Sequence, residues 1–168
     1  MRLPAILLLA ASALSCSDEP RIKDPDLIRV EIVGMYEYEE GGAGVFLQGD
    51  NHRIVPIVIG DFEARALKLA LAGRTTPRPL AYDLLEKLLD ESGGTMSRLI
   101  VHSIVDNVFH GRLELIAGSR VIDIDCRPSD GMVLATRAKA PIYVTRRVMD
   151  QAGTDSRSSK RVMWRSPR

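Results

Sequence analysis

The chain repeats itself at a spacing of 67 residues, and this repeat constrains the fold more than any other feature of the sequence. When the sequence is compared with itself at that shift, turns and apolar positions agree without a gap from residues 32–73 to residues 99–140. A chain of this kind is expected to fold two similar units and pack them together. The positions that match include Gly44 with Gly111, Arg53 with Arg120, Ile57 with Ile124, and Leu67 with Leu134.

In each unit, the pattern of apolar residues and turns predicts three strands followed by a helix. In the first unit the strands are expected at 29–37, 44–48 and 53–59, and the helix at 61–71. In the second they are expected at 97–105, 111–116 and 120–127, with a helix from 129. An added helix at 82–91 carries a leucine stripe that predicts a core-facing surface. A short strand at 141–145 and a helical turn at 146–151 complete an α+β fold, an antiparallel or mixed sheet with helices packed on it.

The strand predicted at 120–127 carries charges on one face only. Alternation places Asp123, Asp125 and Arg127 together, with apolar residues on the other face, and Asp130 follows at a helix start. The first unit fills the same three positions with Pro56, Val58 and Gly60. The fold does not require charges there, so a functional site is favoured over a solvated strand face.

These side chains suit phosphoryl chemistry assisted by a divalent cation. Asp123 and Asp125 are expected about 7 Å apart on one strand face, where they could flank Mg²⁺ or Mn²⁺. Asp130 or Glu63 would contribute if the two helix starts converge. Arg127 and Arg78 are candidates for binding phosphate, because a guanidinium matches phosphate oxygens in a bidentate way. The alternative for Arg127 is a salt bridge to Asp125 or Asp130.

Charge and composition exclude several other functions. Residues 28–153 hold fifteen basic and seventeen acidic residues, so this domain is not built to neutralise many phosphates by itself. Aromatic residues make up only 5% of the chain, which argues against a stacking surface for single-stranded nucleic acid. The sequence also lacks a nucleophile elbow, a phosphate-binding loop and a dinucleotide fingerprint.

Four segments together resemble the bifunctional nuclease domain family: VPIVIGDFEARAL, RPLAYDLLEKLL, VHSIVDNVFHGRLEL and IDIDCRPSDGMVLA. The resemblance covers residues 29–153. It implies a duplicated α+β fold, self-association into a homo-oligomer, and hydrolysis of phosphodiester bonds in DNA and RNA. Nucleic acid is the partner that this activity requires.

The family motifs indicate which residues carry the activity. The Arg-Pro-Ser-Asp run matches Arg127 to Asp130, and Glu63 matches the acid that follows an Ile-Gly turn. The run Arg-Pro-Leu-Thr-His-Asp matches residues 78–83, where Ala81 and Tyr82 replace the usual Thr and His. Combined with the chemistry above, the expected catalytic residues are Asp125, Asp130, Glu63 and Asp83, the phosphate-binding residues are Arg127 and Arg78, and the metal ligands are Asp123 and Asp125.

Both ends of the chain are expected to lie outside this domain. Residues 1–15 resemble a bacterial lipoprotein signal, with a lipobox ending at Cys16, the lipidation site. That interpretation predicts a lipid-anchored protein of the bacterial envelope, facing the periplasm or the exterior. The alternatives are an ordinary cleaved signal peptide, or a misassigned start before a cytoplasmic protein. Residues 16–27 are expected to be a tether, 28–153 the domain, and 154–168 a disordered basic tail.

Two functions follow from these observations. The first is a divalent-metal nuclease anchored to the envelope membrane. The second is a catalytically silent binding module on the same fold, which would use the polar strand face for a ligand or partner. The replacement of the family histidine by Tyr82 favours the second, and the intact Arg-Pro-Ser-Asp run favours the first.

Overall fold

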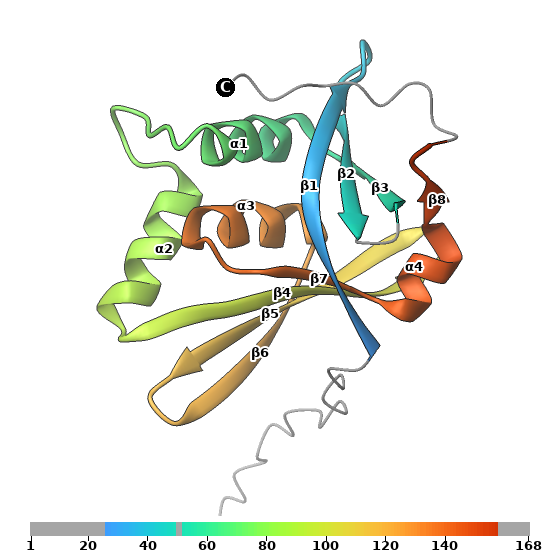
Figure 1. The fold of residues 1–168 in the computed structure, drawn as a ribbon. Helices are drawn as coiled ribbons and strands as arrows, with labels where there is room; N and C mark the ends of the chain where they lie inside the picture. Colours follow the sequence, from blue (N-terminus) through green and yellow to red (C-terminus); the bar gives the residue numbers. More distant parts are fainter. Residues whose placement is uncertain (1–25, 50–51, 158–168) are drawn as a thin grey trace, which may run out of the picture.

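Two three-stranded meanders form the two halves of one sheet in the computed structural model, which describes residues 26–49 and 52–157 (Figure 1). The first meander comprises β1 (Leu27–Glu37), β2 (Ala43–Gly49) and β3 (Arg53–Ile59), and the second comprises β4 (Gly94–Val105), β5 (Val108–Ala117) and β6 (Arg120–Cys126). Within the described residues the sheet has eight strands in the order β6-β5-β4-β7-β1-β2-β3-β8. The two halves therefore have the same internal order on either side of β7.

The strand β7 (Ile142–Thr145) joins the two halves of the sheet. It pairs antiparallel with β1 and parallel with β4, so the sheet is mixed, whereas the pairing within each meander is antiparallel. The link between β4 and β5 is Asp106 and Asn107, both with positive φ. A two-residue turn of this geometry matches the twist of the strands that it connects. The predicted α+β class and the internal duplication are confirmed.

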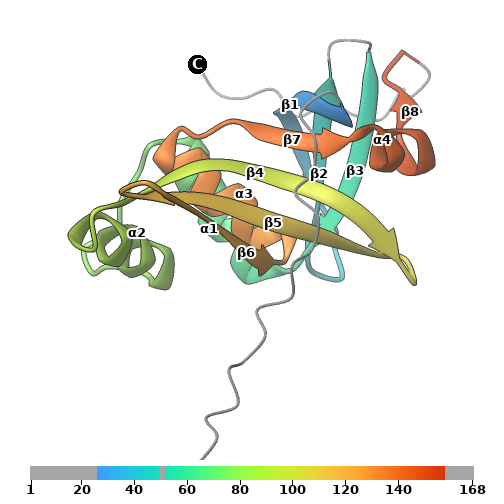
Figure 2. The ribbon, with the colours of Figure 1, turned by 90° about the horizontal axis from the view of Figure 1, so that it is seen from below.

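The helices α1 (Asp61–Leu71) and α3 (Pro128–Ala138) follow β3 and β6, the same place in each unit. They lie against each other, and α3 also packs on β4 and β5 (Figures 1 and 2). Met132 and Val133 of α3 are buried in the core. Gly131 allows this close packing, because a Cβ atom there would lie 2.5 Å from Cδ1 of Leu99. The short helix α4 (Arg146–Ala152) covers the opposite end of the sheet through Val148 and Met149.

The helix α2 (Ala81–Glu91) differs from the sequence prediction. Its leucine stripe was expected to face the core, but no residue of α2 is buried, and Leu84, Leu85 and Leu88 are 51%, 50% and 67% exposed. The prediction is wrong because α2 lies at the end of the sheet where β4 begins and β5 ends, and does not cover the centre of the sheet (Figures 1 and 2). An amphipathic pattern shows that a helix has an apolar face, but it does not show what covers that face.

The sheet extends past the predicted domain boundary at Gly153, because β8 (Thr154–Asp155) pairs with β3. Arg53 of β3 donates hydrogen bonds to Asp150 and to the carbonyl of Gly153, which holds the end of α4 against the sheet. The predicted signal, lipobox and tether up to residue 25, and the tail from residue 158, lie outside the described residues. In the described part, no helix has the length and apolar character needed to cross a membrane.

Candidate functional site

The first turns of α1 and α3 come together at the side chain of Arg127. Nη2 of Arg127 lies 2.6 Å from Oε1 of Glu63, which belongs to α1. Nε lies 2.8 Å from Oδ2 of Asp130 in α3, and Nη2 lies 3.1 Å from Oδ1 of the same carboxylate. One guanidinium therefore bridges two carboxylates from the two units. The alternative predicted for Arg127, a salt bridge to Asp130, is present, and Glu63 is its second partner.

The local sequence explains why three charged groups meet at two helix starts. Pro128 occupies the first position of α3, where its missing N–H costs nothing, and Arg127 precedes it in an extended conformation as the N-cap. Glu63 and Asp130 are each in the first turn, where the helix dipole favours a negative charge. Neither helix has a side chain that caps its first N–H groups. The two helix starts, with their positive dipole ends, thus lie close to Arg127, an arrangement suited to anions.

Gly60, the residue in the first unit that corresponds to Arg127, leaves space for this bridge. A Cβ atom at Gly60 would lie 2.6 Å from Oε2 of Glu63. Its φ of −73° is ordinary for any residue, so space rather than backbone conformation requires glycine. The site is thus asymmetric within a duplicated fold, with one guanidinium between two equivalent carboxylates.

A third helix start contributes Tyr82, at the position where the family resemblance implies a histidine. Its hydroxyl donates a hydrogen bond of 2.6 Å to Oδ1 of Asp130. Burial, followed by this hydrogen bond, raises the pKa of Tyr82 well above its usual range. The phenol therefore stays protonated at neutral pH and acts as a hydrogen-bond donor, whereas a histidine could exchange a proton.

Arg127 is the most exposed of the three charged groups in the cluster, and its positive charge faces solvent. Its side chain is 68% exposed, whereas that of Glu63 is 14% exposed and that of Asp130 is 27% exposed. The hydrogen bond to Asp130, the charge of Asp130 and then the bond to Glu63 raise the pKa of Arg127, which stays charged. Two carboxylates and one guanidinium leave one net negative charge, with the positive group outermost.

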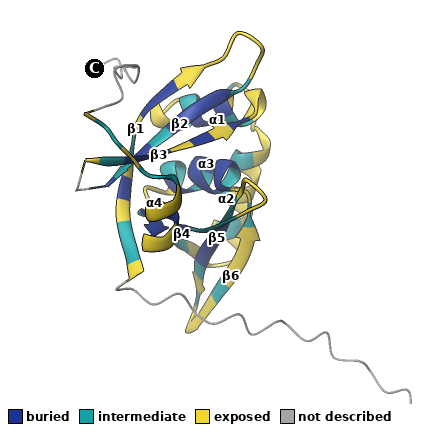
Figure 3. Ribbon diagram, turned by 90° about the vertical axis from the view of Figure 1, so that its right-hand side faces the viewer, coloured by how far each residue is buried: buried dark blue, intermediate teal, exposed yellow. Residues whose placement is uncertain are grey.

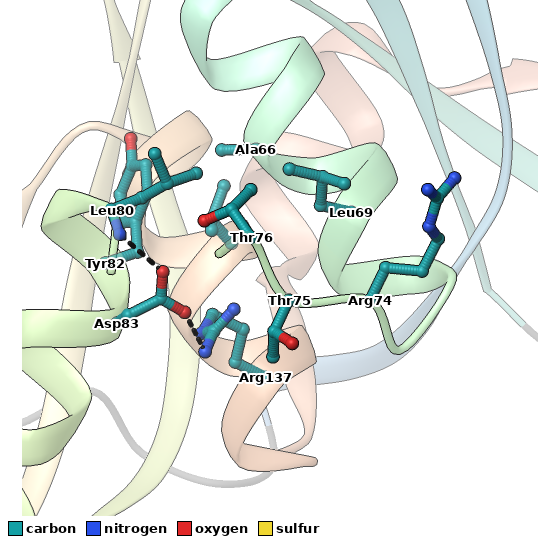
Figure 4. Close-up of a pocket in the computed structure, with 10 residues that line it drawn as sticks. Ala66, Leu69, Arg74, Thr75, Thr76, Leu80, Tyr82, Asp83 and Arg137 are labelled. Atoms are coloured by element: carbon teal, nitrogen blue, oxygen red, sulfur yellow. Dashed lines mark hydrogen bonds and ion pairs between the residues drawn. The ribbon is translucent and has the colours of Figure 1, made fainter. Parts of the chain in front are cut away.

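Asp83 and Arg78, two more of the predicted site residues, lie apart from the Arg127 bridge. Asp83 accepts a hydrogen bond from the backbone N–H of Leu80 at 2.6 Å and forms an ion pair with Arg137 of α3 (Figure 4). Arg137 also pairs with Glu86 at 2.8 Å, so it ties α2 to α3. Arg78 is exposed in the loop before α2.

Asp123 and Asp125 point away from the helices. The residues that alternate with them on β6, Ile124 and Cys126, face α2 and α3, so the two aspartates lie on the other side of the sheet. Asp123 lies 3.6 Å from Nη1 of Arg112. Alternation placed these two acids together correctly, but Asp125 does not join Glu63 and Asp130. In residues 26–49 and 52–157 no three His, Cys, Asp or Glu side chains are grouped closely enough to hold a metal ion.

An apolar groove of about 650 Å³ opens beside the cluster, between α2 and the sheet. Tyr82 and Asp130 line it together with aliphatic side chains of α2, β5 and β6, including Leu85, Leu88, Leu113 and Ile124. Cys126 also lines the groove, and burial, followed by the charges of Asp125 and Asp130, raises its pKa to about 12. Figure 3 shows that β6, at the edge of the sheet, is largely exposed.

Sequence reasoning missed the roles of Tyr82, Gly60 and Arg137. Tyr82 was noted only as a departure from a motif, although its place in the first turn of a helix next to a site motif was a usable signal. Gly60 was noted as the partner of Arg127 across the repeat, but only the structure shows its closeness to Glu63. No pattern in the sequence identified Arg137 as the residue that holds α2.

Known proteins resemble this chain over the region that contains the cluster. The model of the bifunctional nuclease domain matches residues 45–157, which include Glu63, Tyr82, Arg127 and Asp130. An uncharacterized protein of Mycobacterium tuberculosis is 32% identical over 126 residues, 74% of this chain and 75% of that protein. Bifunctional nuclease 1 of Oryza sativa subsp. indica is 28% identical over 98 residues, and Bifunctional nuclease 1 of Arabidopsis thaliana is 26% identical over 96 residues. These matches cover 56% and 55% of this chain, and 30% of each plant protein.

Proposed function

Because the chain belongs to the bifunctional nuclease domain family, we propose that it hydrolyses phosphodiester bonds of DNA or RNA at the Arg127 cluster. The observation that carries this proposal is the Arg127 guanidinium bridging Glu63 and Asp130 at two uncapped helix starts. The names of the plant relatives support the same reaction class.

Each part of the cluster has a role in this reaction. The exposed face of Arg127 binds a phosphate of the substrate, helped by backbone N–H groups at the starts of α1 and α3. Glu63 and Asp130 supply carboxylates next to that phosphate, where a water molecule can be oriented and deprotonated. Tyr82 keeps the Asp130 carboxylate in place through its hydrogen bond. Asp83 acts indirectly in this proposal, because it holds α2, which carries Tyr82, against α3.

We further propose that Mg²⁺ or Mn²⁺ binds at Glu63 and Asp130. Both carboxylates lie within hydrogen-bond distance of the same atom, Nη2 of Arg127, so an ion held by both would take the place of that nitrogen. Mg²⁺ commonly uses one or two carboxylates and fills its other positions with water and phosphate oxygens. Bound there, the ion would stabilise negative charge on the phosphoryl oxygens and reverse the net negative charge of the cluster.

The sequence-based proposal for the metal, Asp123 with Asp125, competes with this location. A titration with Mn²⁺ followed by calorimetry separates the two without relying on activity. We expect the heat of binding to disappear in Glu63→Gln and Asp130→Asn and to persist in Asp125→Asn. Loss of binding only in Asp125→Asn would place the ion on the opposite face of the sheet.

The nuclease proposal is tested with the chain from Ser17 onward, incubated with single-stranded DNA and with RNA in Mg²⁺ or Mn²⁺, and with EDTA in parallel. We expect Asp130→Asn and Glu63→Gln to slow cleavage by about a hundredfold or more, the usual cost of losing one charge-stabilising group. Asp125→Asn is the matched control, an acid-to-amide change on the other face of the sheet. Cleavage that survives the first two substitutions would contradict the proposed site.

A binding module without catalysis is the second candidate. It is favoured by Tyr82, whose protonated phenol replaces a group able to exchange protons near neutral pH. In that case the cluster would bind phosphate without cleaving the chain. Well-folded protein that binds an oligonucleotide through Arg127, and leaves it intact with either metal, would establish this function.

We also propose that the protein is anchored in the bacterial envelope through a lipid on Cys16 and faces the periplasm or the exterior. The support is the lipobox-like sequence that ends at Cys16. Growth with radiolabelled palmitate should label the wild-type chain and leave Cys16→Ser unlabelled. An unlabelled wild-type protein in the cytoplasmic fraction would instead indicate a misassigned start.

A further inference from the structure

The groove beneath α2 has an apolar wall, and two acids, Glu86 and Asp130, also line it. Leu85 and Leu88 line the groove and remain half exposed or more, and Ile124 on the floor is 43% exposed. Contiguous apolar surface of this kind is uncommon on a monomer and marks a site of interaction. The helix itself carries four acidic residues and Lys87. Asp83 and Glu86 pair with Arg137 and Glu91 pairs with Lys87, so the four acids with these two basic partners leave a net charge of about −2.

Residues Ser158 to Arg168 have the complementary composition. They contain three adjacent apolar residues, Val162, Met163 and Trp164, flanked on both sides by basic residues. The segment carries four basic residues and no acidic ones, against the net negative charge of α2. A basic segment with an apolar centre matches an acidic helix that borders an apolar groove.

We propose that residues 158–168 of a second copy of this chain bind in the groove beneath α2. Val162, Met163 and Trp164 would occupy the space above Leu113 and Ile124. The basic residues on either side would lie near the acids of α2. This proposal does not rest on the nuclease activity proposed above.

The positions of the groove and of Arg157 favour a second copy over the same molecule. The described chain ends at Arg157, next to β8, and Val162 can lie at most about 17 Å from it along a fully extended chain. The groove floor is formed by β5 and β6, whereas β8 lies at the other edge of the sheet. Figures 1 and 2 both place α2 and β8 at opposite ends of the molecule.

The fluorescence of Trp164 can be used to follow this interaction, because Trp164 is the only tryptophan in the sequence. Two chains are compared, residues 17–168 and residues 17–157; both include every described helix and strand. We expect the longer chain to form dimers or larger assemblies in light scattering as concentration rises, with Trp164 emission shifting to the blue. The shorter chain should remain monomeric and should bind a synthetic peptide of residues 158–168 with the same blue shift.

Two variants locate the binding surface. Leu88→Asp changes a residue that is 67% exposed, so the fold is retained, and it should weaken peptide binding about tenfold or more through loss of apolar contact. Val108→Asp is the matched control, since Val108 is 59% exposed in the β4–β5 hairpin away from the groove. A peptide with Arg161 and Arg165 changed to Glu tests the charge component independently of the folding of the domain.

Three results would overturn the proposal. Equal masses for the two chains at all concentrations would show that the segment does not join two copies. Peptide binding that survives Leu88→Asp would place the segment on another surface. A blue shift in the longer chain without any change in mass would show that the segment binds within its own molecule.

Discussion

Glu63 and Asp130 occupy the same position in the two units of the repeat, 67 residues apart, and both accept hydrogen bonds from Arg127. Each is the third residue of its helix. A duplicated chain has thus placed two equivalent carboxylates next to each other and added a single guanidinium from one unit. The predictions below follow from that arrangement and from the way α2 is attached to it.

Replacing Arg127 should damage both activity and stability. Arg127→Ala removes the phosphate-binding group and leaves two carboxylates facing each other, so we expect cleavage to fall by about a hundredfold or more. Arg127→Lys keeps the charge but cannot bridge both carboxylates as a planar fork, so it should recover only part of the activity. Arg120→Ala, an exposed arginine at the start of β6, is the control. Equal activity of Arg127→Ala and Arg120→Ala would exclude Arg127 from the site.

Tyr82→Phe should lower the free energy of unfolding by about 1 kcal/mol, because a partly exposed hydrogen bond to a carboxylate is lost. Urea denaturation measures this change, with Tyr36→Phe as the control, since Tyr36 is 56% exposed. The turnover number should fall while the Michaelis constant stays nearly unchanged, as expected when a catalytic carboxylate loses its orientation. A change confined to the Michaelis constant would assign Tyr82 to substrate binding instead.

Gly60→Ala should weaken the cluster without straining the backbone. The new methyl carbon would lie 2.6 Å from Oε2 of Glu63, so it would force the Glu63 carboxylate away from its position. We expect lower activity in the single variant and no additional effect of Gly60→Ala in a Glu63→Ala background, measured as a double-mutant cycle. Additive effects would show that Gly60 acts through something other than Glu63.

Arg137→Met should loosen α2. The side chain of Arg137 is 17% exposed and pairs with both Asp83 and Glu86, so its removal leaves two acids without their partner. We expect a cost of about 2–3 kcal/mol, below that of a fully buried pair. Because α2 buries no residue of its own, the effect should appear as faster amide hydrogen exchange across residues 81–91. Equal protection of α2 in both proteins would show that other contacts hold it.

Cys126 should react slowly with thiol reagents. Its pKa is raised from 9.0 to about 12, so at pH 8 its thiolate fraction is about a thousandfold below that of an ordinary cysteine. The raised pKa contributes stability that is complete below pH 9 and is lost as the pH rises toward 12. Labelling of a Cys16→Ser chain with a disulfide reagent measures the rate, and urea-unfolded protein is the control. Fast labelling of the folded protein would contradict the burial of this thiol.

The fold was predictable because the repeat and the alternation of side chains depend on local sequence. Strand β3 and helices α1 and α2 lie within a residue of their predicted bounds, and the two equal halves of the sheet follow from the repeat. The two-residue strand β8 was missed, since it depends on pairing with β3 rather than on its own sequence.

The site was predictable only in part. Alternation correctly grouped Asp123 with Asp125, but the sequence does not tell which face of the sheet the helices cover, and these acids lie on the uncovered side. The convergence of Glu63 and Asp130 was stated as a condition, and the contacts of Arg127 with both show that it is met. The hydrogen bond of Tyr82 to Asp130 depends on how α2 packs against α3, and local sequence patterns do not predict helix packing.

The central place of β7 has a consequence for how this protein acquires its structure during synthesis. Each meander can form from neighbouring segments, but within the sheet the two are linked only through β7, which follows both of them in the chain. A nascent chain that has not yet released residues 142–145 from the ribosome holds two separate halves with unpaired inner edges at β1 and β4. Assembly of the Arg127 cluster, which needs one helix from each half, is therefore expected to wait until β7 has left the ribosome.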